Sequence, residues 1–319
     1  MIRTYVVGSL LSEENREQIL EAAGKYGFDI TFYETCEEAE GKTGDGEVIY
    51  CTSPDLLTQM PHLKWCHNAN AGVDAFVVTG VFDSGEVMLT NSSGAYGLAI
   101  SEYIIMVTLM LMRRVPEYQD IVSRGEWLHH LPVRSIAGSR IAIVGTGNLG
   151  SNAAKRFKAL GASSVTGFSR SGRSTEGFDE VFTMDSFEER IAGTDVLVLC
   201  VPGTSESAGL LSAERIAVLP EKAFVINVGR GTLVDQDALI DALNAGRIAG
   251  AALDVMVPEP LPAEHPLRSA KNCIITPHVS GDYGLPHTVD KTVEFFCENM
   301  KRYAAGEPLV NLIDPARGY

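Results

Sequence analysis

Apolar and polar positions alternate along this chain in short blocks that predict strands and helices in turn. Apolar runs typical of strands occur at 4–7, 29–32, 48–51, 63–67 and 87–90, and again at 141–144, 164–168, 195–200, 223–228, 249–253 and 273–276. Helical periodicity marks 13–26, 235–245 and 288–303. Strands that alternate with helices from one end to the other predict an α/β fold built on parallel sheets.

Composition and charge narrow the class of protein. The 319 residues carry a formal net charge of −15, so nucleic acid and anionic membrane surfaces are not expected partners. The first residues are typical of a strand rather than a signal peptide. The longest apolar run, 103–112, is about half a membrane span and predicts a buried or interface helix. The six cysteines form no CxxC pair and no histidine has zinc-ligand spacing, which indicates a cytoplasmic protein with reduced thiols and no metal site.

Residues 140–150 contain the most specific local motif. The predicted strand 141–144 runs into Gly145-x-Gly147-x-x-Gly150, and a helical pattern follows. In a dinucleotide-binding fold these glycines make a tight turn, let the pyrophosphate approach the backbone and allow close packing of helix and strand. The phosphates bind the free N–H groups at the start of the helix. The motif in this context predicts dinucleotide binding.

The turn after the next strand bears on which dinucleotide binds. An Asp or Glu about 20 residues after the glycines usually holds the adenosine ribose. Here the strand 164–168 ends instead in Ser169-Arg170-Ser171-Gly172-Arg173. Guanidinium groups and hydroxyls suit a 2′-phosphate, because arginine offers it paired donors. The turn favours NADP over NAD, and the alternative is a solvated basic turn that tolerates NAD.

Three further segments begin where predicted strands end, which is where open α/β sheets bind ligands. The first, 227–231, sets Arg230 between two glycines, where its fork can meet a carboxylate. The second, 252–260, carries Asp254 at the strand end and Glu259 between prolines. The third, 274–281, places His278 in a turn. Each alone is typical of a structural loop, but their joint occurrence after a dinucleotide motif predicts a catalytic site.

In this order the motifs resemble the D-isomer-specific 2-hydroxyacid dehydrogenase family. Beside the glycine motif, the resemblance is carried by Asn227-Val228-Gly229-Arg230-Gly231, Leu253-Asp254-Val255 with Glu259-Pro260, Thr276-Pro277-His278, Ala71-Gly72-Val73-Asp74, Ser101-Glu102-Tyr103 and 306–311. It covers nearly the whole chain. Ser169-Arg170-Ser171 is more similar to the NADP-preferring glyoxylate/hydroxypyruvate reductases than to the NAD-dependent lactate-type enzymes. Pro202-Gly203-Thr204 departs from the family's more usual Pro-Leu-Thr.

The resemblance implies two Rossmann-like or flavodoxin-like parallel-sheet domains with a cleft between them. The substrate-binding lobe would comprise 1–98 with 288–319, and the NAD(P)-binding domain 99–287, with a homodimer built largely on the latter. The implied reaction is hydride transfer from NAD(P)H to a small 2-oxo acid such as glyoxylate or hydroxypyruvate, giving a D-2-hydroxy acid, and the reverse. A phosphoglycerate or other D-2-hydroxyacid dehydrogenase is the alternative within the family. A dinucleotide-sensing corepressor is the alternative outside the enzymes.

The resemblance also implies roles for single residues. Arg230 is expected to bind the substrate carboxylate, helped by backbone N–H groups around Ala71 and Gly72. His278 is expected to donate the proton, with Glu259 orienting it. Asp254 is expected to contact the nicotinamide carboxamide. The full set of expected cofactor contacts comprises Gly145, Thr146, Gly147, Asn148, Leu149, Gly150, Ser169, Arg170, Ser171, Arg173, Cys200, Val201, Pro202, Val228, Gly229, Arg230, Asp254, His278, Ser280 and Gly281.

Overall fold

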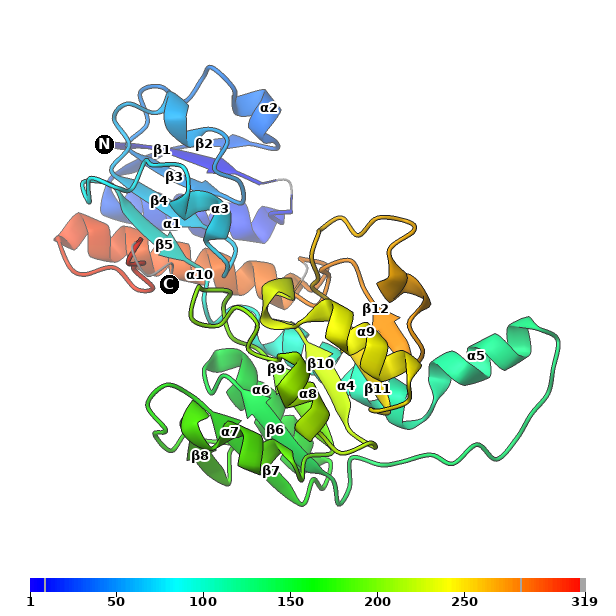
Figure 1. The fold of residues 1–319 in the computed structure, drawn as a ribbon. Coiled ribbons are helices and arrows are strands. Elements are labelled where there is room, and N and C mark those ends of the chain that lie inside the picture. The colour runs from blue at the N-terminus through cyan, green and yellow to red at the C-terminus, as the bar shows by residue number, and fades with distance from the viewer. Residues whose placement is uncertain (9, 282, 316–319) are drawn as a thin grey trace. The chain divides into compact units, whose positions relative to one another are not determined.

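The computed structural model describes residues 1–8, 10–281 and 283–315, and the chain divides into two compact units (Figure 1). Unit 1 comprises 1–96 with 283–319, and unit 2 comprises 97–282. Each unit is built on its own parallel sheet, which confirms the predicted α/β class. The boundaries fall at 96/97 and 282/283 rather than at the expected 98/99 and 287/288. The last four residues of the expected lobe lie outside the described residues.

Unit 1 contains a five-stranded parallel sheet in the order β2-β1-β3-β4-β5. Its strands are β1 (Ile2–Val7), β2 (Phe28–Tyr33), β3 (Val48–Cys51), β4 (Trp65–Asn68) and β5 (Met88–Asn91), and its helices are α1 (Glu13–Tyr26), α2 (Cys36–Ala39), α3 (Asp74–Val77) and α10 (Pro286–Ala305). Alternate strand residues face two separate cores. Val6 and Trp65 pack with Phe296 of α10, whereas Val7 packs in the other core with Phe76 of α3. The C-terminal helix therefore covers a sheet that the first ninety or so residues build.

Local sequence signals set the ends of α1. Ser12 accepts the backbone N–H of Asn15 (3.1 Å), and the Asn15 side chain accepts the backbone N–H of Ser12 in return (3.1 Å). The helix ends at Gly27, whose φ of 84° is one that glycine adopts readily. The helix predicted at 13–26 is confirmed.

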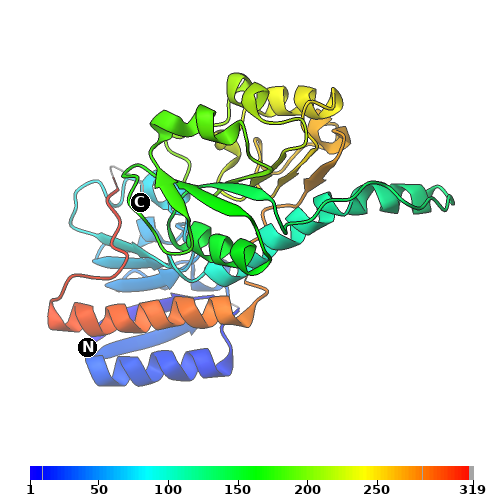
Figure 2. The ribbon, with the colours of Figure 1, turned by 90° about the horizontal axis from the view of Figure 1, so that it is seen from below.

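Unit 2 contains a seven-stranded parallel sheet in the order β12-β11-β10-β9-β6-β7-β8. Its strands are β6 (Arg140–Val144), β7 (Ser164–Phe168), β8 (Glu180–Phe182), β9 (Val196–Leu199), β10 (Phe224–Asn227), β11 (Gly250–Leu253) and β12 (Cys273–Ile275), and its helices are α4 (Gly97–Met112), α5 (Val115–Ser123), α6 (Asn148–Ala159), α7 (Phe187–Ile191), α8 (Ala213–Val218) and α9 (Gln236–Asn244). Helices α4 and α6 pack together on one face, and α7, α8 and α9 lie on the other (Figure 2). Every residue of β9, β10 and β11 is buried, which explains their continuous apolar runs.

A long extension separates α4 from β6 within unit 2. After α4 the chain forms α5 and then an irregular stretch that returns to β6, so α5 projects away from the sheet (Figure 1). Large apolar side chains of this extension are exposed, including Trp127 at 80% and Leu128 at 53%. The apolar pattern of the sequence predicted the helix at 103–112 but not this extension.

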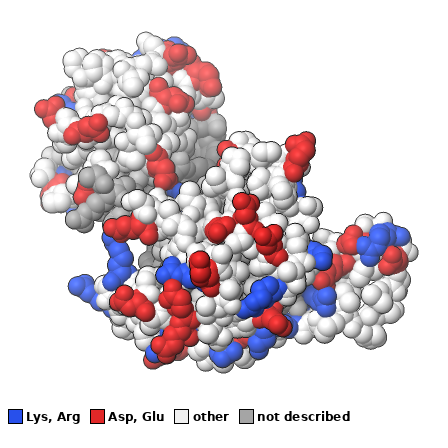
Figure 3. Space-filling view, viewed as in Figure 1, with Lys and Arg blue, Asp and Glu red and all other residues white. Residues whose placement is uncertain are grey.

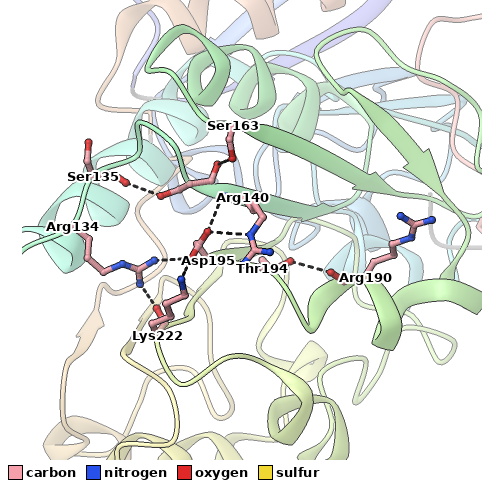
Figure 4. Close-up of polar contacts among 9 residues, drawn as sticks. Arg134, Ser135, Arg140, Ser163, Arg190, Thr194, Asp195 and Lys222 are labelled. Carbon is pink, nitrogen blue, oxygen red and sulfur yellow. Dashed lines mark hydrogen bonds and ion pairs between the residues drawn. The ribbon is translucent and has the colours of Figure 1, made fainter.

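The return of the extension is anchored at Asp195, whose side chain is 8% exposed. Its carboxylate faces three cations, Arg134 at 2.8 Å, Lys222 at 3.4 Å and Arg140 at 3.6 Å (Figure 4). Burial by itself would raise the pKa of Asp195. The backbone N–H of Arg140 and the charges of Lys222 and Arg134 outweigh it and lower the pKa. The carboxylate therefore stays charged and ties the extension to the sheet.

The surface carries charge of both signs. On the face drawn in Figure 3, acidic side chains are scattered over both units, and basic ones lie among them. Among the described residues, no helix is at once long enough and apolar enough to cross a membrane.

Candidate active site

The predicted site residues of unit 2 lie at one edge of its sheet. Because all seven strands are parallel, the loops that leave their carboxyl ends share this edge. The glycine motif follows β6, Arg230 follows β10, Glu259 follows β11 and His278 follows β12. The strand order reverses at β6, which pairs with β7 on one side and β9 on the other. A reversal of this kind marks where open α/β sheets bind their ligands.

The glycine motif between β6 and α6 has the shape of a phosphate cradle. Gly145 has a φ of 106°, and a Cβ there would lie 2.8 Å from the carbonyl oxygen of Cys200. A Cβ on Gly150 would collide with the carbonyl oxygen of Gly145, so this glycine allows α6 to approach the strand end. At Gly147 a Cβ would meet open space. Since no side chain caps the first turn of α6, its N–H groups can bind phosphate oxygens.

The turn after β7 places hydroxyl and guanidinium groups beside this cradle. The hydroxyl of Ser169 accepts the backbone N–H of Gly172 (3.2 Å), which closes the turn. Arg170, Ser171 and Arg173 are exposed on it. Within β7, a Cβ on Gly167 would lie 2.7 Å from Cγ2 of Thr146 in the glycine motif. The glycine motif therefore packs closely against the end of β7, the strand from which the turn 169–173 leaves.

The loop after β9 bounds the cradle on its other side. The thiol of Cys200 donates to the carbonyl oxygen of Val144 (3.2 Å), and burial raises the pKa of Cys200 to about 12. The thiol is therefore neutral at physiological pH. The backbone of Val201 lies close against the loop after β10, since a Cβ on Gly229 would lie only 2.5 Å from the carbonyl oxygen of Val201.

Arg230 is held in a loop that only glycines permit. Asn227, at the end of β10, closes it: its side chain donates to the carbonyl oxygen of Arg230 (2.9 Å) and accepts the N–H of Gly229 (3.1 Å). A Cβ on Gly231 would collide with the backbone of Met256, so the glycine brings the Arg230 loop against the β11 loop. Arg230 is half-buried, and its Nη1 donates to the carbonyl oxygen of Gly229 (2.8 Å).

Gly203 explains part of the departure from the family's usual motif at this position. A Cβ there would lie 2.9 Å from Cγ and 3.1 Å from Cβ of Arg230, and 3.1 Å from the hydroxyl oxygen of Thr232. The absence of a side chain at Gly203 therefore makes room for the aliphatic stem of Arg230.

His278 and Glu259 form a pair across two loops of unit 2. Nδ1 of His278 lies 2.9 Å from Oε2 of Glu259, with side-chain exposures of 51% and 35%. The other carboxylate oxygen of Glu259 accepts the backbone N–H of Met256 (2.8 Å). The hydrogen bond from Met256 thus orients the carboxylate of Glu259 toward the imidazole. Because Nδ1 of His278 pairs with Glu259, Nε2 is left for proton exchange.

The carboxylate of Asp254 is fully buried and grips the loop that carries His278. Its Oδ1 accepts the hydroxyl of Thr276 (2.6 Å) and the N–H of Val279 (2.9 Å), and its Oδ2 accepts the N–H of Ser280 (2.8 Å). The backbone carbonyl of Asp254 accepts the N–H of His278 (2.9 Å). Asp254 therefore clamps residues 276–280, and its expected contact with a nicotinamide stays a prediction.

In unit 1, the loop after β4 presents backbone donors. The side chain of Asn91 donates to the carbonyl oxygen of Ala71 (2.6 Å), and that of Asn68 to the carbonyl oxygen of Gly72 (2.7 Å). Among the described residues, no hydrogen bond is donated by the N–H groups of Ala71 and Gly72. The two N–H groups are therefore available to a small anion, and the expected contact of Ala71 and Gly72 with a substrate carboxylate stays a prediction.

Several residues that shape the site were not predicted from the sequence. The side chains of Asn227, Asn68 and Asn91 each make two hydrogen bonds to loop backbones, and the hydroxyl of Thr276 donates to the carboxylate of Asp254. The signal was the amide or hydroxyl residue at or just after the end of a strand, but many such residues cap loops without any role in a site. Within the described part of the chain, no three His, Cys, Asp or Glu side chains come together as a metal site would require.

Comparison with known proteins places this geometry in a family context. Residues 105–280, more than half of the chain, match the protein family described as D-isomer specific 2-hydroxyacid dehydrogenase, NAD binding domain. A glyoxylate/hydroxypyruvate reductase A of Yersinia enterocolitica is 30% identical over 86% of this chain and 88% of its own.

Solved structures extend the similarity to the whole fold. A D-isomer specific 2-hydroxyacid dehydrogenase family protein of Aeromonas salmonicida superposes with a TM-score of 0.87 at 33% identity, over 99% of this chain and 100% of the other. An NADPH-dependent glyoxylate/hydroxypyruvate reductase of Sinorhizobium meliloti, in complex with NADP and sulfate, gives a TM-score of 0.83 at 26% identity, over 99% and 100% of the two chains.

Proposed function

The chain belongs to the D-isomer specific 2-hydroxyacid dehydrogenase family, and we propose that within it the protein is an NADPH-dependent reductase of small 2-oxo acids of the glyoxylate and hydroxypyruvate type. The broader activity follows from the family: the enzyme uses NAD(P)H to reduce 2-oxo acids to D-2-hydroxy acids. The observation that carries the proposal is the His278–Glu259 pair at 2.9 Å, on the loops after the adjacent strands β12 and β11, with Arg230 on the loop after β10, the next strand along the sheet.

The dinucleotide fits the cradle of unit 2. We assign its pyrophosphate to Gly145–Gly150 and the first turn of α6, because a side chain on Gly150 would collide with the backbone and Gly147 opens on free space. A bound nicotinamide dinucleotide supplies the hydride.

The preference for NADPH is proposed from the turn after β7. Arg170 and Arg173, with the hydroxyls of Ser169 and Ser171, suit a 2′-phosphate, and no carboxylate stands there to repel it. The relative from Sinorhizobium meliloti was solved with NADP. We expect Arg170→Ala to weaken the binding of NADPH far more than the binding of NADH.

The chain's own residues then account for binding and proton transfer. Arg230 binds the substrate carboxylate through its guanidinium fork. His278 gives a proton from Nε2 to the oxygen of the carbonyl group as the alcohol forms, and takes it back in the reverse direction. Glu259 holds Nδ1–H, which fixes the tautomer and balances the charge of the imidazolium.

Initial rates of NADPH and NADH oxidation with glyoxylate, hydroxypyruvate, pyruvate and phenylpyruvate test the proposal. We expect the first two acids with NADPH to give the highest kcat/KM. His278→Ala should lower kcat by roughly 10²–10⁴-fold with little change in NADPH affinity. His62→Ala, at an exposed histidine of unit 1, is the control and should change neither. A preference for NADH, or turnover with none of the four acids, would overturn the proposal.

Arg230→Lys keeps the charge but removes the fork. We expect kcat/KM for the 2-oxo acid to fall by about 10–100-fold, since one charge-assisted hydrogen bond contributes about 1.5–3 kcal/mol. An effect on NADPH affinity alone would contradict the assigned role.

A homodimer in the cytoplasm completes the proposal. The support for a dimer is apolar surface on unit 2: Met106 and Leu109 on α4, and Trp127 and Leu128 on the extension, are exposed. The support for the cytoplasm is the six free cysteines, which stay reduced there. Sedimentation of Trp127→Glu against the unmodified enzyme tests the dimer, because a charge on this surface should shift the protein toward the monomer.

A further inference from the structure

The segment Ser101-Glu102-Tyr103, in the second turn of α4, belongs to a motif that the proposed reaction does not use. Tyr103 lies on α4, and its hydroxyl is 2.6 Å from the hydroxyl oxygen of Thr276, at the start of the loop that carries His278. We infer that Tyr103 is a positioning residue for His278, acting through Thr276 and Asp254. This inference rests on the proposed role of His278 as the proton donor.

The direction of the hydrogen bonds in this chain follows from proton counting. Thr276 has one hydroxyl proton, and its oxygen lies 2.6 Å from Oδ1 of Asp254 and 2.6 Å from Oη of Tyr103. The carboxylate of Asp254 accepts from three neighbours, so the Thr276 proton goes to Asp254. The Tyr103 hydroxyl must then donate to Thr276. Burial raises the pKa of Tyr103 to about 12, which keeps that proton in place at working pH.

The loop needs such support because its backbone is unfavourable. His278 has a φ of 57°, in the left-handed region that few residues other than glycine adopt. Such a conformation is unfavourable for a residue with a side chain and persists only where surrounding contacts fix it. Pro277, His278 and Val279 are exposed, so packing cannot hold them. Hydrogen bonds to Asp254 and to the carbonyl oxygen of Thr276 hold this backbone, and the Thr276 hydroxyl in turn contacts Tyr103.

Helix α4 holds one end of this series of hydrogen bonds rigidly in place. Tyr103 is 8% exposed, and Ile100, Ile104 and Val107 around it are buried. The helix packs on α6 and on the β10 and β11 strands that precede the Arg230 and Asp254 loops. Tyr103 therefore connects the loop of the catalytic histidine to the centre of unit 2. If the hydroxyl of Tyr103 is removed, the side chain of Thr276 can rotate away from Asp254. The loop then loses one of the contacts that hold His278 toward Glu259.

A matched pair in unit 1 provides the control. Tyr50 and Thr292 form a buried hydroxyl pair at 2.8 Å, and Thr292 donates onward to the carbonyl oxygen of Val289 (2.8 Å). The chemistry and the direction of donation are the same as in the Tyr103–Thr276 pair. Tyr50 has no part in the proposed site. Tyr50→Phe and Tyr103→Phe should therefore lower the melting temperature similarly and differ only in their effect on the histidine loop.

The test is a double-mutant cycle in the full-length enzyme. We expect Tyr103→Phe to lower kcat for glyoxylate by about 5–10-fold, with KM and NADPH affinity within about twofold of the unmodified enzyme. Thr276→Val should lower kcat at least as much, Thr276→Ser should restore most of it, and adding Tyr103→Phe to Thr276→Val should change little. An unchanged kcat in Tyr103→Phe, multiplicative losses in the double variant, or an equal loss in Tyr50→Phe would overturn the inference.

Hydrogen exchange separates this inference from the proposed function. The N–H groups of Val279 and Ser280 donate to Asp254, so their exchange reports on the clamp without any substrate. We expect roughly tenfold faster exchange at both in Tyr103→Phe and no change in Tyr50→Phe. Absence of turnover in the unmodified enzyme would refute the proposed function alone, whereas unchanged exchange in Tyr103→Phe would refute the positioning role.

Discussion

Replacing Asp254 by asparagine distinguishes two roles for this residue. The family resemblance expects a contact with the nicotinamide, whereas the structure gives both carboxylate oxygens to the His278 loop. Oδ1 accepts from Thr276 and Val279, and Oδ2 accepts from Ser280. Asparagine has the same shape but only one acceptor oxygen. If that oxygen takes the Oδ1 position, the new NH2 group faces the N–H of Ser280 and two donors meet.

The loss can be sized from these contacts. A hydrogen bond to a charged group contributes about 1.5–3 kcal/mol, and the Ser280 N–H would be left buried without an acceptor. The other two bonds would become neutral and weaker. We therefore expect Asp254→Asn to lower the free energy of unfolding by about 2–4 kcal/mol. A loosened loop should lower kcat by about 10–100-fold, which corresponds to about 1.4–2.8 kcal/mol in the barrier.

Urea unfolding, NADPH titration and steady-state kinetics on the same variant provide the assay. Asp235→Asn is the matched control, because Asp235 caps α9 by accepting the N–H of Ala238 (3.0 Å) and asparagine caps helices equally well. It should leave stability, affinity and kcat nearly unchanged. If Asp254→Asn keeps full stability and kcat but binds NADPH much more weakly, the clamp is wrong and the nicotinamide contact is right.

Two further predictions concern other parts of unit 2. Asp195→Asn should lower the free energy of unfolding by about 1–3 kcal/mol at pH 7, discounted because the three cations around it are partly exposed. Since the folded protein lowers the pKa of Asp195, the difference from the unmodified enzyme should persist above the unfolded pKa of about 3.9 and shrink as the pH falls below it; a difference independent of pH would contradict this. Gly203→Ala should raise KM for the 2-oxo acid by several-fold, because its Cβ would lie 2.9 Å from Cγ of Arg230. Gly24→Ala on α1, where a Cβ meets nothing within 4 Å, is the control, and equal KM values in both variants would refute the argument.

The sequence predicted the elements best where burial is complete. β9, β10 and β11 are buried on both faces, so their residues are apolar without interruption and the runs were plain to read. β8 was missed because it is a short edge strand, Glu180–Phe182, whose first residue is charged and exposed, so it shows no continuous apolar run. The extension around α5 was missed because it lies outside both cores, and periodicity reports on burial.

The candidate catalytic residues could also be identified from the sequence, but the hydrogen bonds that connect their loops could not. Glycines with a steric duty, such as Gly150 and Gly231, and the single histidine after a predicted strand could be found in the motifs. Asn227 and Thr276 could not, because a side chain that closes a loop is recognised only by its partner. The Tyr103–Thr276 bond joins residues 173 positions apart, and nothing in either segment refers to the other.

The sequence by itself determined the alternation of strands and helices, the dinucleotide motif and the candidate residues for binding a carboxylate and moving a proton. Those properties depend on local pattern, backbone freedom and side-chain chemistry, all of which are written along the chain. Only the tertiary structure decided what Asp254 holds. Its carboxylate accepts hydrogen bonds from Thr276, Val279 and Ser280 because β11 and β12 are adjacent and parallel in a particular register. Thr276 in turn contacts Tyr103 because α4 packs against that part of the sheet. Strand order and register are set by the packing of the whole unit, and so no segment of the sequence contains them alone.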